Sequence, residues 1–280
     1  MDILEIIKAI VLGIVQGITE WLPVSSTGHM ILFDQFMNFM SQNKDFKDLF
    51  LVVILFGSIL AVVTMYFHKL NPFSPKKSVQ EKKDTWTMWW KVLVGCVPAA
   101  IIGLLFDDII DTYLYKSFVV AAMLIIYGIA FIIIENRKKT PKIEDIGALS
   151  YKTAALIGVF QVLALVPGTS RSGATILGAV ILGTSRYVAA EFSFFLAVPV
   201  MLGASGLKIF KYFMDFGMFG TQELYLLIIG MAVAYIVSVL AIKFLMEYIR
   251  KNDFKAFGYY RIVLGILIIL YFAISGAAVV

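Results

Sequence analysis

Long apolar stretches almost free of charge constrain the fold of this 280-residue chain more than any other feature. A helix of about 20 apolar residues crosses the ~30 Å hydrocarbon core of a bilayer. Only 15% of the residues are charged, whereas soluble domains have about 25%, so a water-soluble globular fold is excluded. We expect one all-α, polytopic membrane domain over residues 1–280, with six spanning helices at about 49–67, 88–106, 118–134, 191–207, 224–242 and 262–280.

Two further apolar regions are interrupted near the middle by proline and small polar residues. Residues 9–33 are broken at 23–28, which read Pro-Val-Ser-Ser-Thr-Gly, and residues 153–185 are broken at 167–173, which read Pro-Gly-Thr-Ser-Arg-Ser-Gly. The second region is too long for one span and too short for two spans and a turn. Irregular backbone at membrane depth is tolerated where it is buried in protein or lines a wet cavity. Each region therefore predicts a re-entrant helix–loop–helix hairpin.

The distribution of charge tests this arrangement. Lysine and arginine cluster at 68–91, 136–152 and 243–261, whereas 107–111 is acidic and is expected to form a solvated outer loop. If 153–185 re-enters without crossing, all three basic segments lie on one side of the membrane, as the positive-inside rule prefers. The net charge of +5 is thus attributed to topology, and no nucleic-acid partner is expected.

The two broken regions also resemble each other. Gln16 precedes the first proline-containing break and Gln161 precedes the second, each on an apolar helix with a preceding Gly. Three spans follow each hairpin, so the second half enters the membrane upside down relative to the first. We therefore expect an inverted-topology repeat with halves at about 1–135 and 150–280. Such folds place their site near the midplane, at the repeat interface, where the two hairpin tips would meet.

Glu20 and Arg171 are the only formally charged residues inside the two hairpins. A charge at that depth costs ~2.5–3.5 kcal/mol and marks a candidate functional site, although a structural ion pair joining the halves is the plainer alternative. Gln16 and Glu20, spaced i and i+4, share a helix face, and His29 begins the return helix. Small and hydroxyl-bearing residues surround these groups at Ser25, Ser26 and Thr27 in the first break and at Gly168, Thr169, Ser170, Ser172 and Gly173 in the second.

This combination of groups suits the binding and transfer of a phosphoryl group. The arginine fork matches phosphate, and turns that lead into helix N-termini offer N–H groups to anions. Positioning and charge neutralisation supply most of the catalysis of phosphoryl transfer. A secondary transporter, such as a polyprenyl-phosphate flippase, would use the same inverted repeat and anion clamp without hydrolysis. Replacing Ser26 by alanine separates the two classes, because a transporter has no need of a nucleophile; a purely structural scaffold is a third alternative.

Three segments carry a resemblance to a known family. Residues 16–30 read Gln-Gly-Ile-Thr-Glu-Trp-Leu-Pro-Val-Ser-Ser-Thr-Gly-His-Met, residues 167–175 read Pro-Gly-Thr-Ser-Arg-Ser-Gly-Ala-Thr, and residues 191–199 begin with Glu-Phe-Ser-Phe-Phe. In these segments, and in length and span layout, the chain resembles the bacterial undecaprenyl-diphosphate phosphatases of the bacitracin-resistance type. Glu191 itself is expected to be an acid at a helix N-terminus, favoured by the helix dipole.

The resemblance implies hydrolysis of undecaprenyl diphosphate to the monophosphate, which recycles the lipid carrier for cell-wall synthesis and confers bacitracin resistance. It implies that Glu20 is a general base or metal-associated carboxylate and that Ser26 is the nucleophile, although direct attack by water stays open. His29 becomes an acid/base or alternative nucleophile, and Arg171 the phosphate clamp. The expected substrate-binding residues are Gln16, Ser25, Thr27, Gly168, Thr169, Ser170, Ser172 and Gly173.

The resemblance also implies a divalent cation, Mg²⁺ or Ca²⁺. The first signature position is Gln16 here rather than an acid, which leaves the signature with one carboxylate, Glu20, rather than two. The metal is therefore expected to arrive bound to the diphosphate, as Mg²⁺ commonly does. The expected location is the bacterial inner membrane, with the site open to the extracytoplasmic side. The expected partners are the polyprenyl diphosphate lipid, the membrane and a second copy of the chain in a homodimer.

Overall fold

The structure, a computed structural model, describes residues 3–37, 39–40, 43–114, 116–137 and 139–275. Within these residues the secondary structure is helical, apart from one isolated bridge between Ile143 and Thr184. The elements in chain order are α1 (Ile3–Thr19), α2 (Ser26–Met37), α3 (Lys44–Met65), α4 (Phe67–Leu70), α5 (Val79–Leu114), α6 (Ser117–Asn136), η1 (Ile146–Ala148), α7 (Tyr151–Val162), η2 (Leu163–Leu165), α8 (Arg171–Ile181), α9 (Arg186–Phe216), α10 (Thr221–Lys251) and α11 (Lys255–Ser275).

Six of the described helices are long and apolar enough to cross a membrane: α3, α5, α6, α9, α10 and α11. Each of them coincides with one predicted span, so the all-α polytopic fold is confirmed. The first predicted span, 49–67, runs two residues beyond the end of α3 at Met65, and residues 276–280 of the last lie outside the described residues. The predicted acidic loop at 107–111 is wrong, because α5 continues through it to Leu114. No glycine or proline interrupts residues 104–114, so nothing in the backbone stops the helix before the acids.

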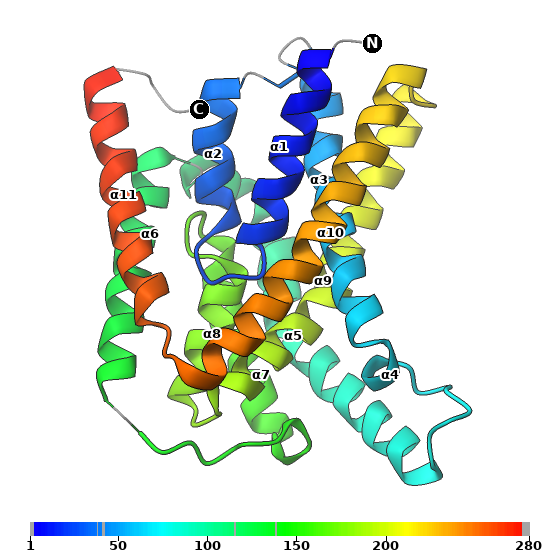
Figure 1. Cartoon of the computed structure of the whole chain (residues 1–280), viewed down its shortest axis with the longest axis vertical. Coiled ribbons are helices and arrows are strands. Elements are labelled where there is room, and N and C mark those ends of the chain that lie inside the picture. The colour runs from blue at the N-terminus through cyan, green and yellow to red at the C-terminus, as the bar shows by residue number, and fades with distance from the viewer. Residues whose placement is uncertain (1–2, 38, 41–42, 115, 138, 276–280) are drawn as a thin grey trace.

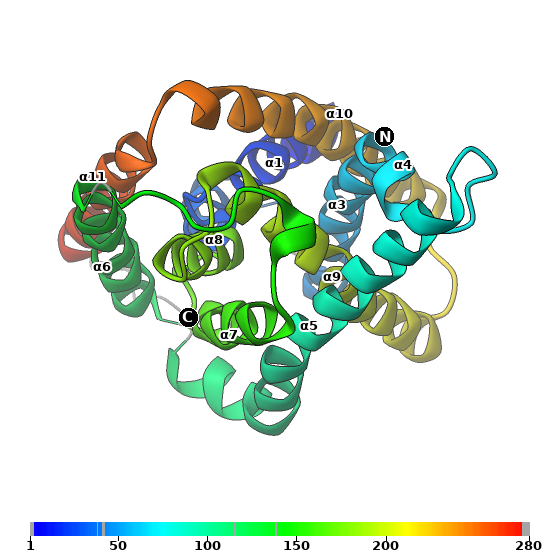
Figure 2. The same ribbon diagram turned by 90° about the horizontal axis from the view of Figure 1, so that it is seen from below.

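Two pairs of shorter helices occupy the middle of the molecule. Figure 1 shows α1 and α2 descending from one end and α7 and α8 rising from the other, with both connecting turns at mid-height. The helices α2, α7 and α8 have 12, 12 and 11 residues, too few to cross a bilayer at 1.5 Å per residue. Seen from below, α8 lies inside a ring that includes α3, α5, α6, α10 and α11 (Figure 2). The re-entrant course of the two pairs relative to a bilayer stays a prediction.

Each helix pair packs against an outer helix that comes from the other part of the chain. α1 approaches α10 closely, since a Cβ added to Gly13 would lie 2.8 Å from the carbonyl oxygen of Gly230. α7 packs on α5 in the same way, since a Cβ added to Gly158 would overlap the backbone of Gly95. Small residues allow such close helix contact where lipid gives no hydrophobic drive. Each pair thus packs on a helix that the sequence assigns to the other half; the division into repeat halves stays a prediction.

The basic segments gather at one end of the molecule. In Figure 1 the α4–α5 connection, the chain from α6 to α7 and the turn from α10 to α11 all lie at the lower end, while the N-terminus lies at the upper end. Lys138, part of one basic segment, lies outside the described residues. Arg261, counted above among the charges of the last basic segment, is instead 0% exposed inside the protein, so its assignment to that surface is corrected.

Candidate active site

Two strained serines immediately precede α2 and α8, the second helices of the two central pairs. Ser25 has a φ of 74° and Ser170 a φ of 71°, in the left-handed region that non-glycine residues rarely adopt. Each hydroxyl accepts a hydrogen bond from the third backbone N–H of its helix: Gly28 N lies 3.3 Å from Ser25 Oγ, and Gly173 N lies 3.1 Å from Ser170 Oγ. Such strain persists where the surrounding structure enforces it, and it clusters at functional sites. The two turns therefore share one N-cap geometry, and the N-termini of α2 and α8 point towards the middle of the molecule.

Glu20, at the end of the first helix, joins the polar groups of this turn. Its Oε2 accepts hydrogen bonds from Gln16 Nε2 at 3.1 Å and from Ser26 Oγ at 3.0 Å. Glu20 and Gln16 are each 5% exposed, whereas Ser26 and Thr27 are half-buried at the start of α2. The predicted face shared by Gln16 and Glu20 is present, and the carboxylate lies in position to take the proton of the Ser26 hydroxyl.

Arg171, the first residue of α8, reaches across to the same carboxylate. Its Nη2 lies 3.4 Å from Glu20 Oε1, and its Nη1 donates to the carbonyl of Ser193 at 2.8 Å. The guanidinium carbon also lies 5.9 Å from the centroid of the Trp21 ring, within cation–π range. The structure therefore brings the charged groups of the two turns together, as predicted.

Two buried donors of the second turn have no hydrogen-bond partner in the described part of the chain. These are Arg171 Nε and Thr169 Oγ1, and Thr169 is 0% exposed. Buried polar groups without partners are rare and call for an explanation. An oxyanion held between the turns would accept from both, which makes this the position of a candidate phosphate subsite.

Ser172 ties the two turns together. It is 1% exposed, and its hydroxyl lies 3.1 Å from the carbonyl oxygen of Glu20 and 3.3 Å from that of Leu22. Ser170 Oγ lies 3.2 Å from Ser172 Oγ. Because these hydroxyls are occupied by the helix cap and by the first turn, they hold the turns in register in this structure. Their predicted contact with phosphate stays a prediction.

His29 lies next to the turn but faces a different partner. Its Nδ1 is 2.7 Å from the carbonyl oxygen of Ser25, so Nδ1 carries a proton and donates it. Its Nε2 is 2.6 Å from the hydroxyl of Tyr260 on α11, and the two rings stack with an interplanar angle of 4°. Both ring nitrogens are thus engaged by other groups than Ser26, and Glu20 is the base that contacts Ser26 directly.

Arg261 is the residue that sequence reasoning missed. Its side chain, on α11, is completely buried and donates to carbonyl oxygens of both turns: Pro23 O at 3.2 Å in the first turn, and Gly168 O at 3.0 Å and Thr169 O at 2.8 Å in the second. The guanidinium carbon also lies 5.5 Å from the ring centroid of Tyr127. The sequence carried little signal for this position, since Arg261 directly precedes the predicted span at 262–280; in the structure α11 already begins at Lys255.

The two predicted glycines of the second turn are required by packing. Gly168 has a φ of +90°, and an added Cβ would overlap the backbone of Val120. A Cβ on Gly173 would lie 2.9 Å from Arg261 Nη1. Their absence of side chains therefore lets the second turn lie against α6 and against the buried arginine.

Glu191 does not lie at a helix N-terminus as predicted. α9 begins at Arg186, because Ser185 caps it by accepting from Val188 N at 3.2 Å. Glu191 falls in the second turn, is 2% exposed, and forms an ion pair with Lys69 at 2.6 Å. Its partner comes from α4, so the acid fastens that short helix to α9 and does not enter the candidate site.

The site offers limited ligands to a metal. Among the described residues no group of three or more His, Cys, Asp or Glu side chains gathers to hold an ion. Glu20 supplies one carboxylate, and Gln16, whose Nε2 donates to it, keeps an amide oxygen for a further contact. One carboxylate plus substrate phosphates is a common donor set for Mg²⁺, so the residues fit a cation that enters with a diphosphate.

The fold and this site define a class: a multi-pass helical membrane protein with an internal polar centre built from two converging turns. A family profile described as "Bacitracin resistance protein BacA" matches residues 9–267. The chain belongs to this BacA family.

Curated relatives are similar over almost the whole chain. A protein of Enterococcus faecalis named "Undecaprenyl-diphosphatase" is 59% identical over 96% of this chain and 98% of its own length. One of Latilactobacillus sakei with the same name is 56% identical over 95% of this chain and 97% of its own. "Undecaprenyl-diphosphatase 1" of Clostridioides difficile is 58% identical over 97% of each chain. The family match over residues 9–267 spans both turns of the candidate site.

Proposed function

We propose that this protein hydrolyses undecaprenyl diphosphate to undecaprenyl phosphate and inorganic phosphate, and so recycles a lipid carrier of cell-wall synthesis. The observation that carries the proposal is the Glu20 carboxylate, which contacts the Ser26 hydroxyl with one oxygen and the Arg171 guanidinium with the other. In this proposal Glu20 is the base, Ser26 the nucleophile and Arg171 the phosphate ligand. The names of relatives 54–59% identical to this chain support the substrate. The family name supports a role in bacitracin resistance.

In the proposed reaction, the residues of the first turn carry out the attack on phosphorus. Ser26 Oγ attacks the terminal phosphorus while its proton passes to Glu20 Oε2, which lies 3.0 Å away. The bond from Oγ to phosphorus forms, the anhydride bond breaks, and undecaprenyl phosphate leaves with the bridging oxygen, which takes the proton from Glu20. Glu20, ionised again, then deprotonates a water molecule that attacks the phosphoserine; inorganic phosphate leaves and the proton returns to Ser26 Oγ. Direct attack by water, with Ser26 as a phosphate ligand, is the alternative route through the same base.

The second turn neutralises the phosphate. Arg171 Nε and Thr169 Oγ1 are the donors without partners in the described structure, and the terminal phosphate oxygens would accept from both. The contact of Arg171 Nη1 with the carbonyl of Ser193 fixes the plane of the guanidinium. Donors held in place before the reaction stabilise developing charge without reorganisation, which accounts for the rate enhancement expected from this turn.

A divalent cation, Mg²⁺ or Ca²⁺, enters with the diphosphate in this proposal. Glu20 and the amide oxygen of Gln16 are the protein groups that would hold it, and it would neutralise phosphate charge during the transfer. The site is proposed to open to the outside of the bacterial inner membrane, opposite the basic segments that gather at the lower end of Figure 1. A homodimer is proposed as the assembly.

The test is a phosphate-release assay with purified protein, Mg²⁺ and a long-chain polyprenyl diphosphate. Glu20→Ala and Arg171→Ala are each expected to lower turnover by at least about 100-fold, since each removes a group that acts on the transferred phosphoryl. Glu144→Ala and Lys152→Ala change exposed charges at the basic end and serve as matched controls with unchanged turnover. Wild-type turnover in both site variants refutes the proposal.

A further inference from the structure

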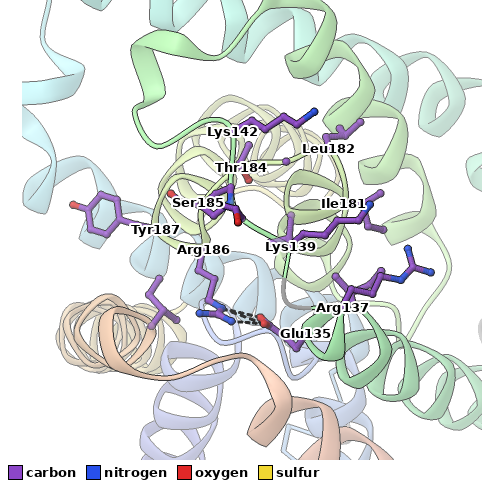
Figure 3. A pocket seen from close by; sticks show the side chains of 16 residues that line it. Glu135, Arg137, Lys139, Lys142, Ile181, Leu182, Thr184, Ser185, Arg186 and Tyr187 are labelled. Carbon is purple, nitrogen blue, oxygen red and sulfur yellow. Dashed lines mark hydrogen bonds and ion pairs between the residues drawn. The ribbon is translucent and has the colours of Figure 1, made fainter.

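A second polar pocket lies at the basic end of the molecule, away from the candidate active site. Its volume is about 400 Å³, and it is bordered by the end of α6, the following chain, the end of α8 and the start of α9 (Figure 3). α8 begins with Arg171 at the candidate site and ends at Ile181, on the pocket wall. At 1.5 Å per residue, this helix separates the two places by about 15 Å.

Positive charge dominates the lining of this pocket. Arg137, Lys139, Lys142 and Arg186 line it, against the single carboxylate of Glu135. That carboxylate is already neutralised, because Arg186 Nε donates to Oε1 at 3.0 Å and to Oε2 at 3.2 Å, and Phe254 N donates to Oε1 at 3.2 Å. Among the described residues no carboxylate lies in ion-pair distance of Arg137, Lys139 or Lys142. Three cations at the pocket therefore have no counter-ion in the described part of the chain.

Neutral donors lie in the same wall. Thr184 lines the pocket and is 3% exposed, and its Oγ1 has no hydrogen-bond partner in the described part of the chain. The next residue, Ser185, caps α9, so the N-terminus of this 31-residue helix also borders the pocket. The first N–H groups of a helix and its dipole favour an anion. The buried hydroxyl is an independent sign that an acceptor belongs here, since buried donors are rarely left unpaired.

The wall that carries these groups is held in place by backbone contacts. Lys142 N and Ile143 N both donate to the carbonyl of Gly183, at 2.8 and 3.0 Å, and Ser185 N donates back to the carbonyl of Ile143 at 2.8 Å. The chain after α6 is thereby fastened to the turn before α9. A cation-rich concavity with a preformed wall suits a compact anion better than a flexible surface does.

We propose that this pocket binds a phosphate group, separately from the candidate active site. The guanidinium of Arg137 and the ammonium groups of Lys139 and Lys142 supply charge-assisted donors, and Thr184 supplies a neutral one. Two sources present this chemistry at the basic end of a membrane protein. One is the headgroup of an anionic phospholipid, which basic membrane-proximal segments attract, and the other is free inorganic phosphate.

The experiment measures thermal unfolding of the purified, full-length protein in a neutral detergent. One arm titrates inorganic phosphate against chloride at equal ionic strength, and a second compares nanodiscs of phosphatidylglycerol and of phosphatidylcholine. Both arms are run on wild type and on Arg171→Ala, so that phosphate bound at the candidate active site is recognised by its loss. We expect saturable stabilisation in Arg171→Ala by at least one of the two phosphate sources.

Two variants test the pocket itself. Lys139→Gln/Lys142→Gln changes only exposed side chains and is expected to weaken the apparent affinity by about tenfold or more, and Thr184→Val by about threefold or more. Lys76→Gln/Lys83→Gln removes two exposed charges from another segment of the same end and is the matched control. Stabilisation by phosphate alone or by phosphatidylglycerol alone identifies the source. No stabilisation from either, or equal stabilisation in the pocket variants and the control, overturns the proposal.

Discussion

Glu20 and Arg171 lie 151 residues apart in the chain, yet Arg171 Nη2 lies 3.4 Å from Glu20 Oε1 inside the protein. Each charge is fixed by a neutral neighbour from its own half: Gln16 donates to the carboxylate, and the carbonyl of Ser193 accepts from the guanidinium. In a purely structural ion pair, every buried donor of the arginine would be expected to have a hydrogen-bond acceptor. Arg171 Nε is buried without a partner in the described structure, which favours a binding site over a purely structural contact.

Ser26→Ala is expected to lower phosphate release by about 100-fold or more, because it removes the hydroxyl that Glu20 activates. Steady-state assays with a polyprenyl diphosphate measure this loss. Ser58→Ala is the matched control, since Ser58 is a fully buried serine whose hydroxyl donates to Ile54 O of its own helix. A Ser26→Ala enzyme that keeps wild-type turnover would assign the attack on phosphorus to water.

Removal of divalent cations by a chelator is expected to abolish turnover, and Gln16→Glu is expected to lower the Mg²⁺ concentration that restores half of it. Position 16 lies one helical turn before Glu20, and the present Gln16 Nε2 is 3.1 Å from Glu20 Oε2. A carboxylate at position 16 therefore supplies a second hard ligand beside Glu20. Titration of chelated protein with Mg²⁺ measures both effects. An unchanged midpoint in Gln16→Glu would show that this helix face does not meet the metal.

Arg261→Met is expected to lower the free energy of unfolding by about 3 kcal/mol or more. The methionine fills much of the volume but leaves the buried carbonyls of Pro23, Gly168 and Thr169 without donors, at ~1–3 kcal/mol for each unsatisfied group. Denaturant or thermal unfolding in detergent measures the change. Lys251→Met, on an exposed side chain at the end of α10, is expected to stay within about 0.5 kcal/mol of wild type.

Gly168→Ala is expected to destabilise the fold or to displace the second turn, because the residue has a φ of +90° and a Cβ would overlap the backbone of Val120. The expected loss is about 2 kcal/mol or more, accompanied by reduced phosphate release. Gly206→Ala gives the comparison: that glycine lies in helix α9 and an added Cβ meets nothing within 4 Å. Equal stability of the two variants would contradict the packing described for the turn.

The helices and the two breaks were predictable from local sequence. Uncharged stretches of spanning length leave few alternatives to a membrane helix. Proline followed by small polar residues located both turns, although the last three residues of each predicted break belong to α2 or α8. The convergence of Glu20 and Arg171 was also predictable, because a buried charge needs a partner and each hairpin carried one charge.

Other features depend on packing that no local pattern reports. Residues 107–111 are helical since acidic side chains do not end a helix in the absence of a breaker. Glu191 pairs with Lys69, 122 residues earlier, and Nε2 of His29 contacts the hydroxyl of Tyr260 on α11. The positive-inside rule counts every lysine and arginine near the end of a span as a surface charge, so it does not distinguish the buried Arg261 from its exposed neighbours.

The position of Arg261 on α11 has a consequence for biogenesis. A ribosome completes both turns well before it reaches this residue, so the nascent chain enters the membrane with the carbonyls of Pro23 and Gly168 lacking their final donor. The last helix must then insert and dock before these groups are satisfied. Premature termination upstream of α11 would therefore yield a product that contains every residue of the proposed catalytic machinery but lacks the arginine that joins its two turns.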